Sequence, residues 1–227
     1  MKREIVITAD GSTTIHLPDW NEQYHSKHGA IQEAYHVFIK RGLEAVLNSN
    51  VSILEIGFGT GLNCFITLLE AVKNNLNINY VGIEAYPVID TEIQQLNYVS
   101  ELKSGNSKAL FDTIHSVTWE EKHQLGTHFK LTKRQQFFQD IIDVNTYDLI
   151  YFDAFGAEHQ PELWTAIIFK KMFIALKLNG ILVTYSAKGS VRRAMQEVGF
   201  EVERLPGPPG KREMLRAKKV ANNIQRS

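Results

Sequence analysis

Residues 51–63 read Val51-Ser-Ile-Leu-Glu-Ile-Gly-Phe-Gly-Thr-Gly-Leu-Asn63, and this stretch decides the fold. The apolar run 52–56 has the composition of a buried strand, and residues 62–73 carry apolar side chains at helical spacing. Three alternating glycines separate the two patterns. Glycine lets the backbone take positive φ and lets a flat ligand lie against the main chain, beside the free amides of a helix N-terminus. The stretch therefore predicts a strand, a nucleotide-binding loop and a helix.

The spacing of these glycines distinguishes between kinds of nucleotide site. A dinucleotide fingerprint needs G-x-G-x-x-G and a P-loop closes with G-K-[ST], and the loop has neither pattern. Glu55 precedes the first glycine by two positions, and a carboxylate there suits a cation and repels a pyrophosphate. The arrangement resembles the first motif of class I S-adenosylmethionine-dependent methyltransferases. That resemblance implies cofactor contacts from the following residues: Glu55, Gly57, Phe58, Gly59, Thr60, Gly61 and Asn63.

Length and composition favour one globular unit. The chain has 227 residues, of which 44% are hydrophobic and 22% charged, enough for a sizeable core. No stretch is long and apolar enough to span a membrane, and the N-terminus lacks the apolar core of a signal peptide, so we expect a cytosolic protein. The single cysteine, Cys64, excludes an internal disulfide, and without a His/Cys cluster we expect no metal.

Charge is unevenly distributed along the chain. Residues 186–227 hold 10 Lys and Arg against 4 Asp and Glu, whereas residues 1–185 hold 15 against 21. A basic C-terminal part suits a polyanion such as a nucleic acid, although a solvated basic tail explains the same numbers.

The first 50 residues are expected to form an N-terminal extension. Residues 5–17 predict a hairpin with an Asp-Gly turn, residues 18–29 a polar loop, and residues 30–47 a helix interrupted by Gly42. A loop directly before a cofactor domain is well placed to act as a lid. Tyr24 and Glu33 are its candidate cofactor contacts, and each could equally be an ordinary surface or capping residue.

Two further acidic residues follow predicted strands. Glu84 ends the strand at 78–83, where a carboxylate can accept both ribose hydroxyls of an adenosine cofactor, whether dinucleotide or S-adenosylmethionine. After a strand at 129–132, Asp140 can accept the adenine amino group beside Ile141, or instead cap the next turn. Residues 87–126 look helical and mixed.

The second half continues the alternation of strands and helices. The strand beginning at residue 147 is apolar enough to be central in a parallel sheet, and Asp153 ends it at the edge where such sheets bind ligands. We expect a helix over 162–177, a strand over 181–185, a helix over 190–199, and an antiparallel pair at 200–204 and 211–218. In this division, residues 51–219 form the cofactor-binding domain and residues 220–227 a flexible tail.

Longer motifs make the resemblance more specific. They are Asp153-Ala-Phe-Gly-Ala157 with Pro161-Glu-Leu-Trp-Thr165, residues 185–195, Gly199-Phe-Glu-Val202, Pro209 to Leu215, and the Y-H-S-x-x-G-A-x-Q-E-x-x-H-V-F-I pattern at 24–39. Together they resemble the methyltransferase domain of MnmC, a bacterial tRNA-modifying family. The resemblance implies a class I α/β fold: a Rossmann-like, mostly parallel seven-stranded sheet whose last strand is antiparallel.

The resemblance also implies an activity: methylation of 5-aminomethyl-2-thiouridine at the tRNA wobble position by S-adenosylmethionine. Two-domain members carry a C-terminal FAD-dependent oxidase. This chain ends at Ser227 and resembles the stand-alone members, so FAD is not expected and the aminomethyl precursor must come from elsewhere. We predict tRNA, through its anticodon stem-loop, as the partner, and no stable protein partner.

The amine to be methylated must lose a proton before it can act as a nucleophile. Asp153 is the candidate to orient the amine and to accept that proton, and it could equally contact the ammonium of the cofactor. Phe155 and Tyr185 are candidates for the wall that stacks on the base. The expected phosphate contacts are basic: Lys188, Arg192, Arg193, Lys211 and Arg212.

Three alternatives remain at this stage. A methyltransferase acting on a small molecule or a protein would have no use for the basic end. An aminopropyltransferase resembling spermidine synthase shares the fold and would use a decarboxylated cofactor with a polyamine. A non-catalytic RNA-binding protein would lack affinity for the cofactor.

Overall fold

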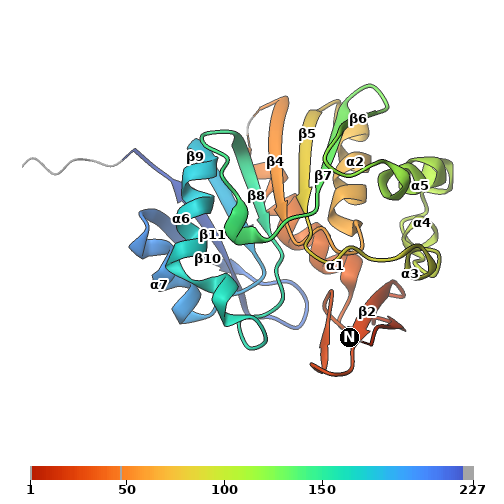
Figure 1. The fold of residues 1–227 in the computed structure, drawn as a ribbon, viewed down its shortest axis with the longest axis horizontal. Helices are drawn as coiled ribbons and strands as arrows, with labels where there is room; N and C mark the ends of the chain where they lie inside the picture. The colour runs from red at the N-terminus through yellow and green to blue at the C-terminus, as the bar shows by residue number, and fades with distance from the viewer. Residues whose placement is uncertain (1, 47, 222–227) are drawn as a thin grey trace, which may run out of the picture.

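A computed structural model describes residues 2–46 and 48–221 (Figure 1). Within them the main sheet has eight strands in the order β10-β11-β9-β8-β4-β5-β7-β6. The strands are β4 (Asn50–Ile56), β5 (Asn77–Ile83), β6 (Lys122–Leu125), β7 (Phe129–Arg134), β8 (Tyr147–Phe152), β9 (Leu176–Thr184), β10 (Phe200–Pro206) and β11 (Glu213–Lys219). Strands β7, β5, β4, β8 and β9 pair in parallel, and β11 pairs antiparallel with both β9 and β10. This is the expected class I order with one strand, β6, added at the edge.

Helices cover both faces of this sheet. One face packs on α1 (Ala30–Ala34), the π-helix η1 (Tyr35–Lys40), α2 (Leu62–Asn74) and α5 (Lys108–Ser116). The other packs on α6 (Ala166–Ala175) and α7 (Gly189–Glu197). Successive residues of β4 alternate between the two cores: Ile53 lies in the first and Leu54 in the second. A strand buried on both faces explains the uninterrupted apolar run in the sequence.

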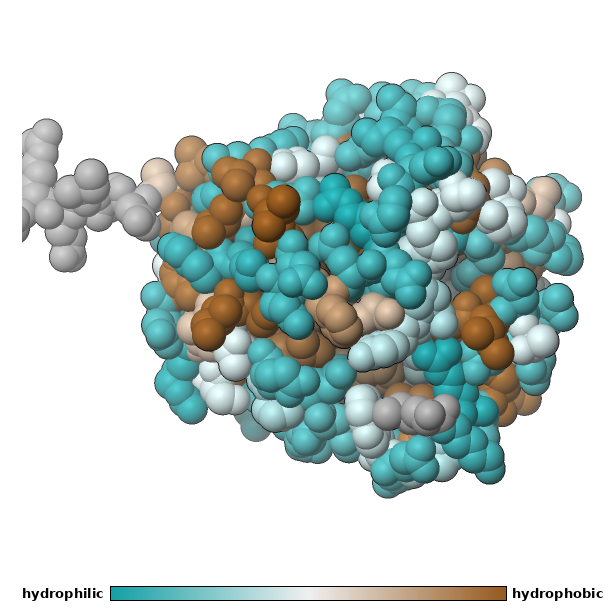
Figure 2. Space-filling view, viewed as in Figure 1, coloured by the Kyte–Doolittle hydropathy of each residue, from teal (hydrophilic) through white to brown (hydrophobic). Residues whose placement is uncertain are grey.

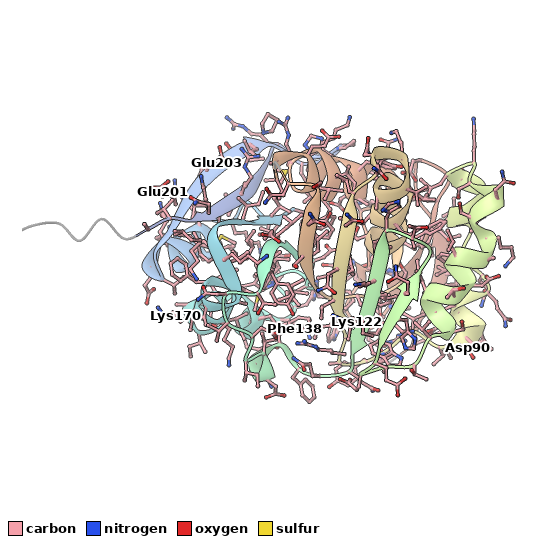
Figure 3. All side chains as sticks on the ribbon, turned by 90° about the horizontal axis from the view of Figure 1, so that it is seen from above. Asp90, Lys122, Phe138, Lys170, Glu201 and Glu203 are labelled. Carbon is pink, nitrogen blue, oxygen red and sulfur yellow. The ribbon has the colours of Figure 1, made fainter. Side chains whose placement is uncertain are left out.

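Short elements complete the chain. They are η2 (Leu43–Ala45), α3 (Asp90–Ile93), α4 (Tyr98–Glu101), η3 (Gly105–Ser107), η4 (Phe138–Asp140) and η5 (Pro161–Trp164). In Figure 3, Glu201 and Glu203 of β10 lie at one end of the molecule and Asp90 of α3 at the other. None of the helices in the described ranges could cross a bilayer. Most of the face in Figure 2 is hydrophilic, with apolar patches on its left side and at its lower right.

The N-terminal hairpin forms a separate three-stranded antiparallel sheet: β1 (Glu4–Ile7), β2 (Thr13–Leu17) and β3 (Glu22–Gln23). The expected hairpin is confirmed, and it lies below the main sheet in the view of Figure 1. The segment after it is helical as predicted, with a break at Gly42, and Ala34, Val37 and Phe38 join the core of the main sheet. Residue 47 and most of the expected tail, 222–227, lie outside the described residues.

Several predicted boundaries were wrong. The helix expected over 162–177 is divided at Thr165 into η5 and α6, and β9 begins early, at Leu176, with Asn179 in a left-handed conformation (φ 65°). Residues 122–125 form β6 where a mixed helical segment was expected. Short polar strands at a sheet edge bury little, so their apolar pattern is weak.

Candidate active site

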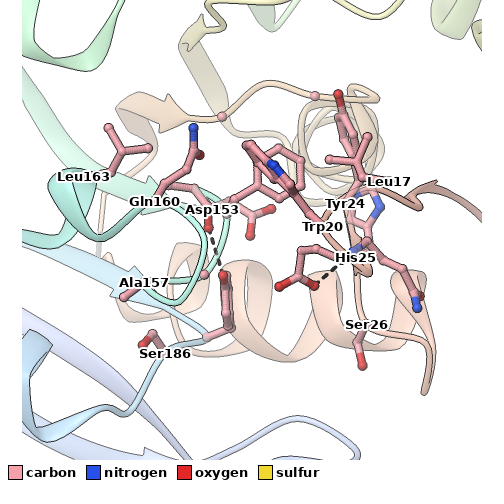
Figure 4. Close-up of a pocket in the computed structure, with 18 of the residues that line it drawn as sticks. Leu17, Trp20, Tyr24, His25, Ser26, Asp153, Ala157, Gln160, Leu163 and Ser186 are labelled. Atoms are coloured by element: carbon pink, nitrogen blue, oxygen red, sulfur yellow. Dashed lines mark hydrogen bonds between the residues drawn. The ribbon is translucent and has the colours of Figure 1, made fainter. Parts of the chain in front are cut away.

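A cavity of about 1020 Å³ lies where β4, β5 and β8 end (Figure 4). The N-terminal segment from Leu17 to Glu33 and the β10–β11 turn at Gly210 and Lys211 supply much of the remaining wall. In Figure 4, Trp20, Tyr24 and His25 lie to one side of this space and Asp153 to the other. The location is the one expected for a ligand of a parallel α/β sheet. The loop predicted as a lid does line the site.

The glycine loop has the backbone that its sequence predicts. Gly57, Gly59 and Gly61 have φ angles of 90°, 49° and 71°. The backbone amides of Gly57 and Phe58 both donate to the carbonyl oxygen of Ile83, at 3.0 and 2.9 Å, which holds the loop against the end of β5. A Cβ added at Gly57 would lie 2.7 Å from the carbonyl oxygen of Asp153. Larger residues are excluded by both conformation and space.

Glu84 lies directly beside this loop. One carboxylate oxygen accepts the amide of Gly59 at 3.0 Å, and the other accepts the amide of Tyr86 at 3.0 Å. Gly57, Phe58, Gly59 and Glu84 all line the cavity. The glycine loop after β4 and the acidic residue after β5 therefore lie side by side in the cavity wall, as predicted.

Asn63, at the start of α2, connects two acidic residues. Its side-chain amide nitrogen donates to Glu55 Oε1 and to Asp153 Oδ2, both at 2.9 Å. Glu55 is fully buried, which raises its pKa well above the ordinary value, and it does not itself line the cavity. Asn63 does, and its buried Oδ1 has no hydrogen-bond partner among the described residues. An acceptor of this kind is suited to an incoming donor such as an ammonium.

Asp153 lies at the base of the cavity and titrates unusually. Its pKa is raised to about 7, chiefly by burial and secondly by the neighbouring charge of Glu33. The hydrogen bond from Asn63 and the charge of Lys211 act in the opposite direction. A carboxyl with this pKa can both accept and release a proton near neutral pH.

Glu33 and Lys211 form an ion pair at the wall of the cavity. Lys211 Nζ donates to Glu33 Oε1 at 2.6 Å and lies 3.9 Å from the centre of the Tyr185 ring. The second oxygen of Glu33 accepts the amide of Ser26 at 2.9 Å. Glu33 is buried, with 7% of its surface exposed. Two segments far apart in the chain are thereby joined across the site.

Aromatic side chains form another part of the wall. The ring of Phe155 packs edge-on against Tyr24 and Trp20, with centroids 5.0 and 5.7 Å away. Tyr185 donates through its hydroxyl to the carbonyl oxygen of Ala154 at 2.8 Å. Trp164 is buried in the core.

Some predicted site residues lie elsewhere. Those outside the cavity lining are Glu55, Thr60, Gly61, Asp140, Ile141, Arg192, Arg193 and Arg212. Asp140 is exposed and Ile141 is in the core, whereas their neighbours Phe138 and Gln139 do line the cavity. Lys188 lines the cavity and pairs with Glu158 at 2.7 Å. Two residues of the cavity lining were not predicted: Trp20, which stacks on His159, and His25.

His25 anchors the lid to the glycine loop. Its Nδ1 lies 3.1 Å from Thr14 Oγ1 and its Nε2 3.5 Å from Thr60 Oγ1, and Thr60 in turn accepts the hydroxyl of Tyr98 at 2.9 Å. Burial lowers the pKa of His25 to about 4, so the ring is neutral at pH 7. Thr60 therefore supports the loop from behind.

Comparison with known proteins agrees with this geometry. Residues 112–220 match a family model described as S-adenosyl-L-methionine-dependent methyltransferase. This match and the fold support a methyltransferase enzyme. A crystal structure of MnmC2 from Aquifex aeolicus superposes on this methyltransferase with a TM-score of 0.76 and 25% identity, covering 97% of this chain and 71% of the other. Spermidine synthase from Thermotoga maritima shares the fold alone, with a TM-score of 0.53 and 14% identity.

Curated relatives of the methyltransferase carry the name tRNA 5-methylaminomethyl-2-thiouridine biosynthesis bifunctional protein MnmC. The protein from Hydrogenovibrio crunogenus is 29% identical over 86% of this chain, and that from Delftia acidovorans 30% identical over 90%. The chain spans about a third of the length of these relatives, 31% and 33%.

The residues present fit an S-adenosylmethionine cofactor. The glycine backbone and Glu84 together offer a surface for an adenosine, and the unpaired Asn63 Oδ1 offers an acceptor for an ammonium. The cavity lining contains six carboxylates against four Lys and Arg, which suits a cationic ligand. Among the described residues, no group of three or more His, Cys, Asp or Glu could hold a metal ion.

Proposed function

We propose that this methyltransferase transfers a methyl group to the aminomethyl nitrogen of 5-aminomethyl-2-thiouridine at the wobble position of tRNA. The observation that carries the proposal is the likeness to MnmC2 over 97% of the chain, at a higher TM-score and identity than for the spermidine synthase. The names of the curated relatives point to the same nucleoside. The excess of carboxylates in the cavity lining, which suits a cationic amine, supports it independently.

Different residues of the cavity would bind the two ends of the cofactor. Gly57, Phe58, Gly59 and Glu84 would hold the adenosine part of the cofactor, and Asn63 its ammonium. When bound, S-adenosylmethionine supplies an electrophilic methyl carbon: the amine nitrogen forms the new bond as the carbon–sulfur bond breaks, and sulfur keeps the electron pair. Holding the two reacting atoms in a water-poor site supplies most of the acceleration that such a displacement needs.

Asp153 handles the proton of the amine. A substrate ammonium has no lone pair until it loses a proton, and Asp153, whose pKa is raised to about 7, accepts that proton at its carboxylate. Asn63 holds the carboxylate in place through its 2.9 Å hydrogen bond. Aromatic side chains at Tyr24 and Phe155 offer flat apolar surfaces to a base that leaves its stack, which an anticodon loop permits.

A transfer assay tests the proposal. Labelled methyl from S-adenosylmethionine should appear on tRNA that carries the aminomethyl wobble group and be absent from tRNA of cells unable to make that group. Digestion to nucleosides should place the label on the wobble nucleoside, and Asp153→Asn should reduce the rate strongly while the cofactor still binds. With cofactor binding confirmed separately, absence of label on both tRNA samples would rule out this acceptor and redirect the search to small amines.

A further inference from the structure

An alkyl ammonium group already lies inside the cavity. Lys211 Nζ donates to Glu33 Oε1 at 2.6 Å and stands 3.9 Å from the centre of the Tyr185 ring. A carboxylate on one side and an aromatic face on another form a general recognition site for a primary ammonium. The terminal –CH2–NH3+ of the lysine is the same chemical group as the aminomethyl substituent of the proposed substrate.

The groups around this ammonium are fixed from different parts of the fold. Glu33, on α1, is held by the amide of Ser26 on its second oxygen at 2.9 Å. Asp153, at the end of β8, is held by Asn63 of α2. Glu33 and Lys211 both act on the ionisation of Asp153, with opposite signs, so the three charges are within electrostatic reach of one another.

We infer that Glu33 is the second carboxylate of the substrate-amine site, and that Lys211 occupies this site until the substrate amine displaces it. The inference rests on the proposed function for the identity of the amine. Glu33 then recognises the ammonium, Tyr185 stacks against it, and Asp153 accepts its proton. This assignment moves Glu33 from the cofactor to the substrate.

Displacement gives Lys211 a second role. Its side chain is one-third exposed and belongs to the turn between β10 and β11, so its ammonium can leave toward solvent without moving the sheet. Outside the cavity it becomes available to a tRNA phosphate. Binding of the substrate amine therefore releases the Lys211 ammonium, which can then bind a phosphate.

A small-amine titration tests the exchange without tRNA. The dissociation constant of n-propylammonium is measured by ligand-observed NMR, with propan-1-ol as the uncharged probe. Lys211→Met should bind propylammonium at least tenfold more tightly than the wild type, and the Glu33→Gln/Lys211→Met double variant should lose that gain. Lys108→Met, which removes an exposed lysine paired with Asp112, is the matched control. Circular dichroism checks folding, and Lys211→Gln replaces Lys211→Met if the latter does not fold.

Kinetics and calorimetry then locate the effect of Glu33. With aminomethyl tRNA, Glu33→Gln should lower kcat/KM at least tenfold, mainly through KM, while the dissociation constant of S-adenosylmethionine stays within twofold. Equal propylammonium binding by the wild type, Lys211→Met and the double variant would overturn the inference. A tenfold loss of cofactor affinity in Glu33→Gln would overturn it too, since Glu33 would then hold the cofactor. Failure of the proposed function is distinct, because wild-type protein would then leave the tRNA unmethylated.

Discussion

Replacing Asp153 by Asn should make the stability of the folded chain less dependent on pH between 5 and 8. Burial raises the pKa of Asp153 to about 7, whereas an exposed aspartate titrates near 3.8. Between these values the unfolded chain loses a proton that the folded chain keeps, so the wild type loses stability as pH rises toward 7. Each pH unit in that window corresponds to about 1.4 kcal/mol. From pH 5 to 8 the loss is at most about 3 kcal/mol, because the side chain keeps some contact with solvent.

Urea unfolding of the cofactor-free protein at pH 5 and pH 8 measures this directly. The gain in free energy of unfolding from Asp153→Asn should be larger at pH 8 by about 2 to 3 kcal/mol. Asn can still accept the hydrogen bond from Asn63, so packing is preserved. Asp112→Asn, at an exposed site, is the control and should show no such difference. An equal effect of Asp153→Asn at both pH values would show that Asp153 titrates normally and would remove the basis for its role as proton acceptor.

Three further changes probe the loop, the lid and the basic end. Gly59→Ala should destabilise the fold by about 1–2 kcal/mol, since φ is 49°, and weaken cofactor binding at least tenfold by calorimetry; Gly105→Ala, with open space around it, should change neither. His25→Ala should cost about 1–2 kcal/mol of unfolding free energy at pH 7 and less at pH 5. The reason is that the unfolded chain takes up a proton below pH 6.5 that the folded histidine, with its pKa lowered to about 4, refuses. Arg212→Glu should weaken tRNA binding and flatten its salt dependence by about one unit of slope, with cofactor affinity unchanged; an unaltered slope in filter binding would contradict a phosphate contact there.

The features that sequence predicts best are those in which local chemistry and fold require the same residue. Gly57 needs positive φ and space beside the Asp153 carbonyl, and Glu84 must follow a strand next to that loop, so both positions are readable from spacing alone. In α2, the spacing of apolar residues did not predict correctly which side chains are buried. Val72 belongs to the apolar side chains at helical spacing in residues 62–73, yet it is 61% exposed. Thr67 and Glu70 are buried instead, because α1 and α5 pack on the helix from directions that its own pattern does not reveal.

Partners distant in sequence could not be predicted. Lys211 looked like a free phosphate contact because no local pattern shows that Glu33, 178 positions earlier, reaches it. Asp140 was predicted as a cofactor contact for its chemistry, yet the turn η4 directs Phe138 and Gln139 to the cavity and leaves Asp140 at the surface. Both cases depend on tertiary placement within a few ångströms, which composition and spacing do not encode.

The contacts that close the cavity can form only after residues 206–211 have been synthesised. His36 Nε2 meets the carbonyl oxygen of Pro206 at 2.7 Å, and Glu33 meets Lys211, so the lid depends on residues made about 170 positions later. During synthesis, the glycine loop and its neighbouring strands can pair well before that turn emerges from the ribosome. The nascent chain must therefore carry a half-built pocket, with the carboxylate of Glu33 unpaired, until the final hairpin arrives. The site therefore cannot be complete before residues 206–211 have been synthesised.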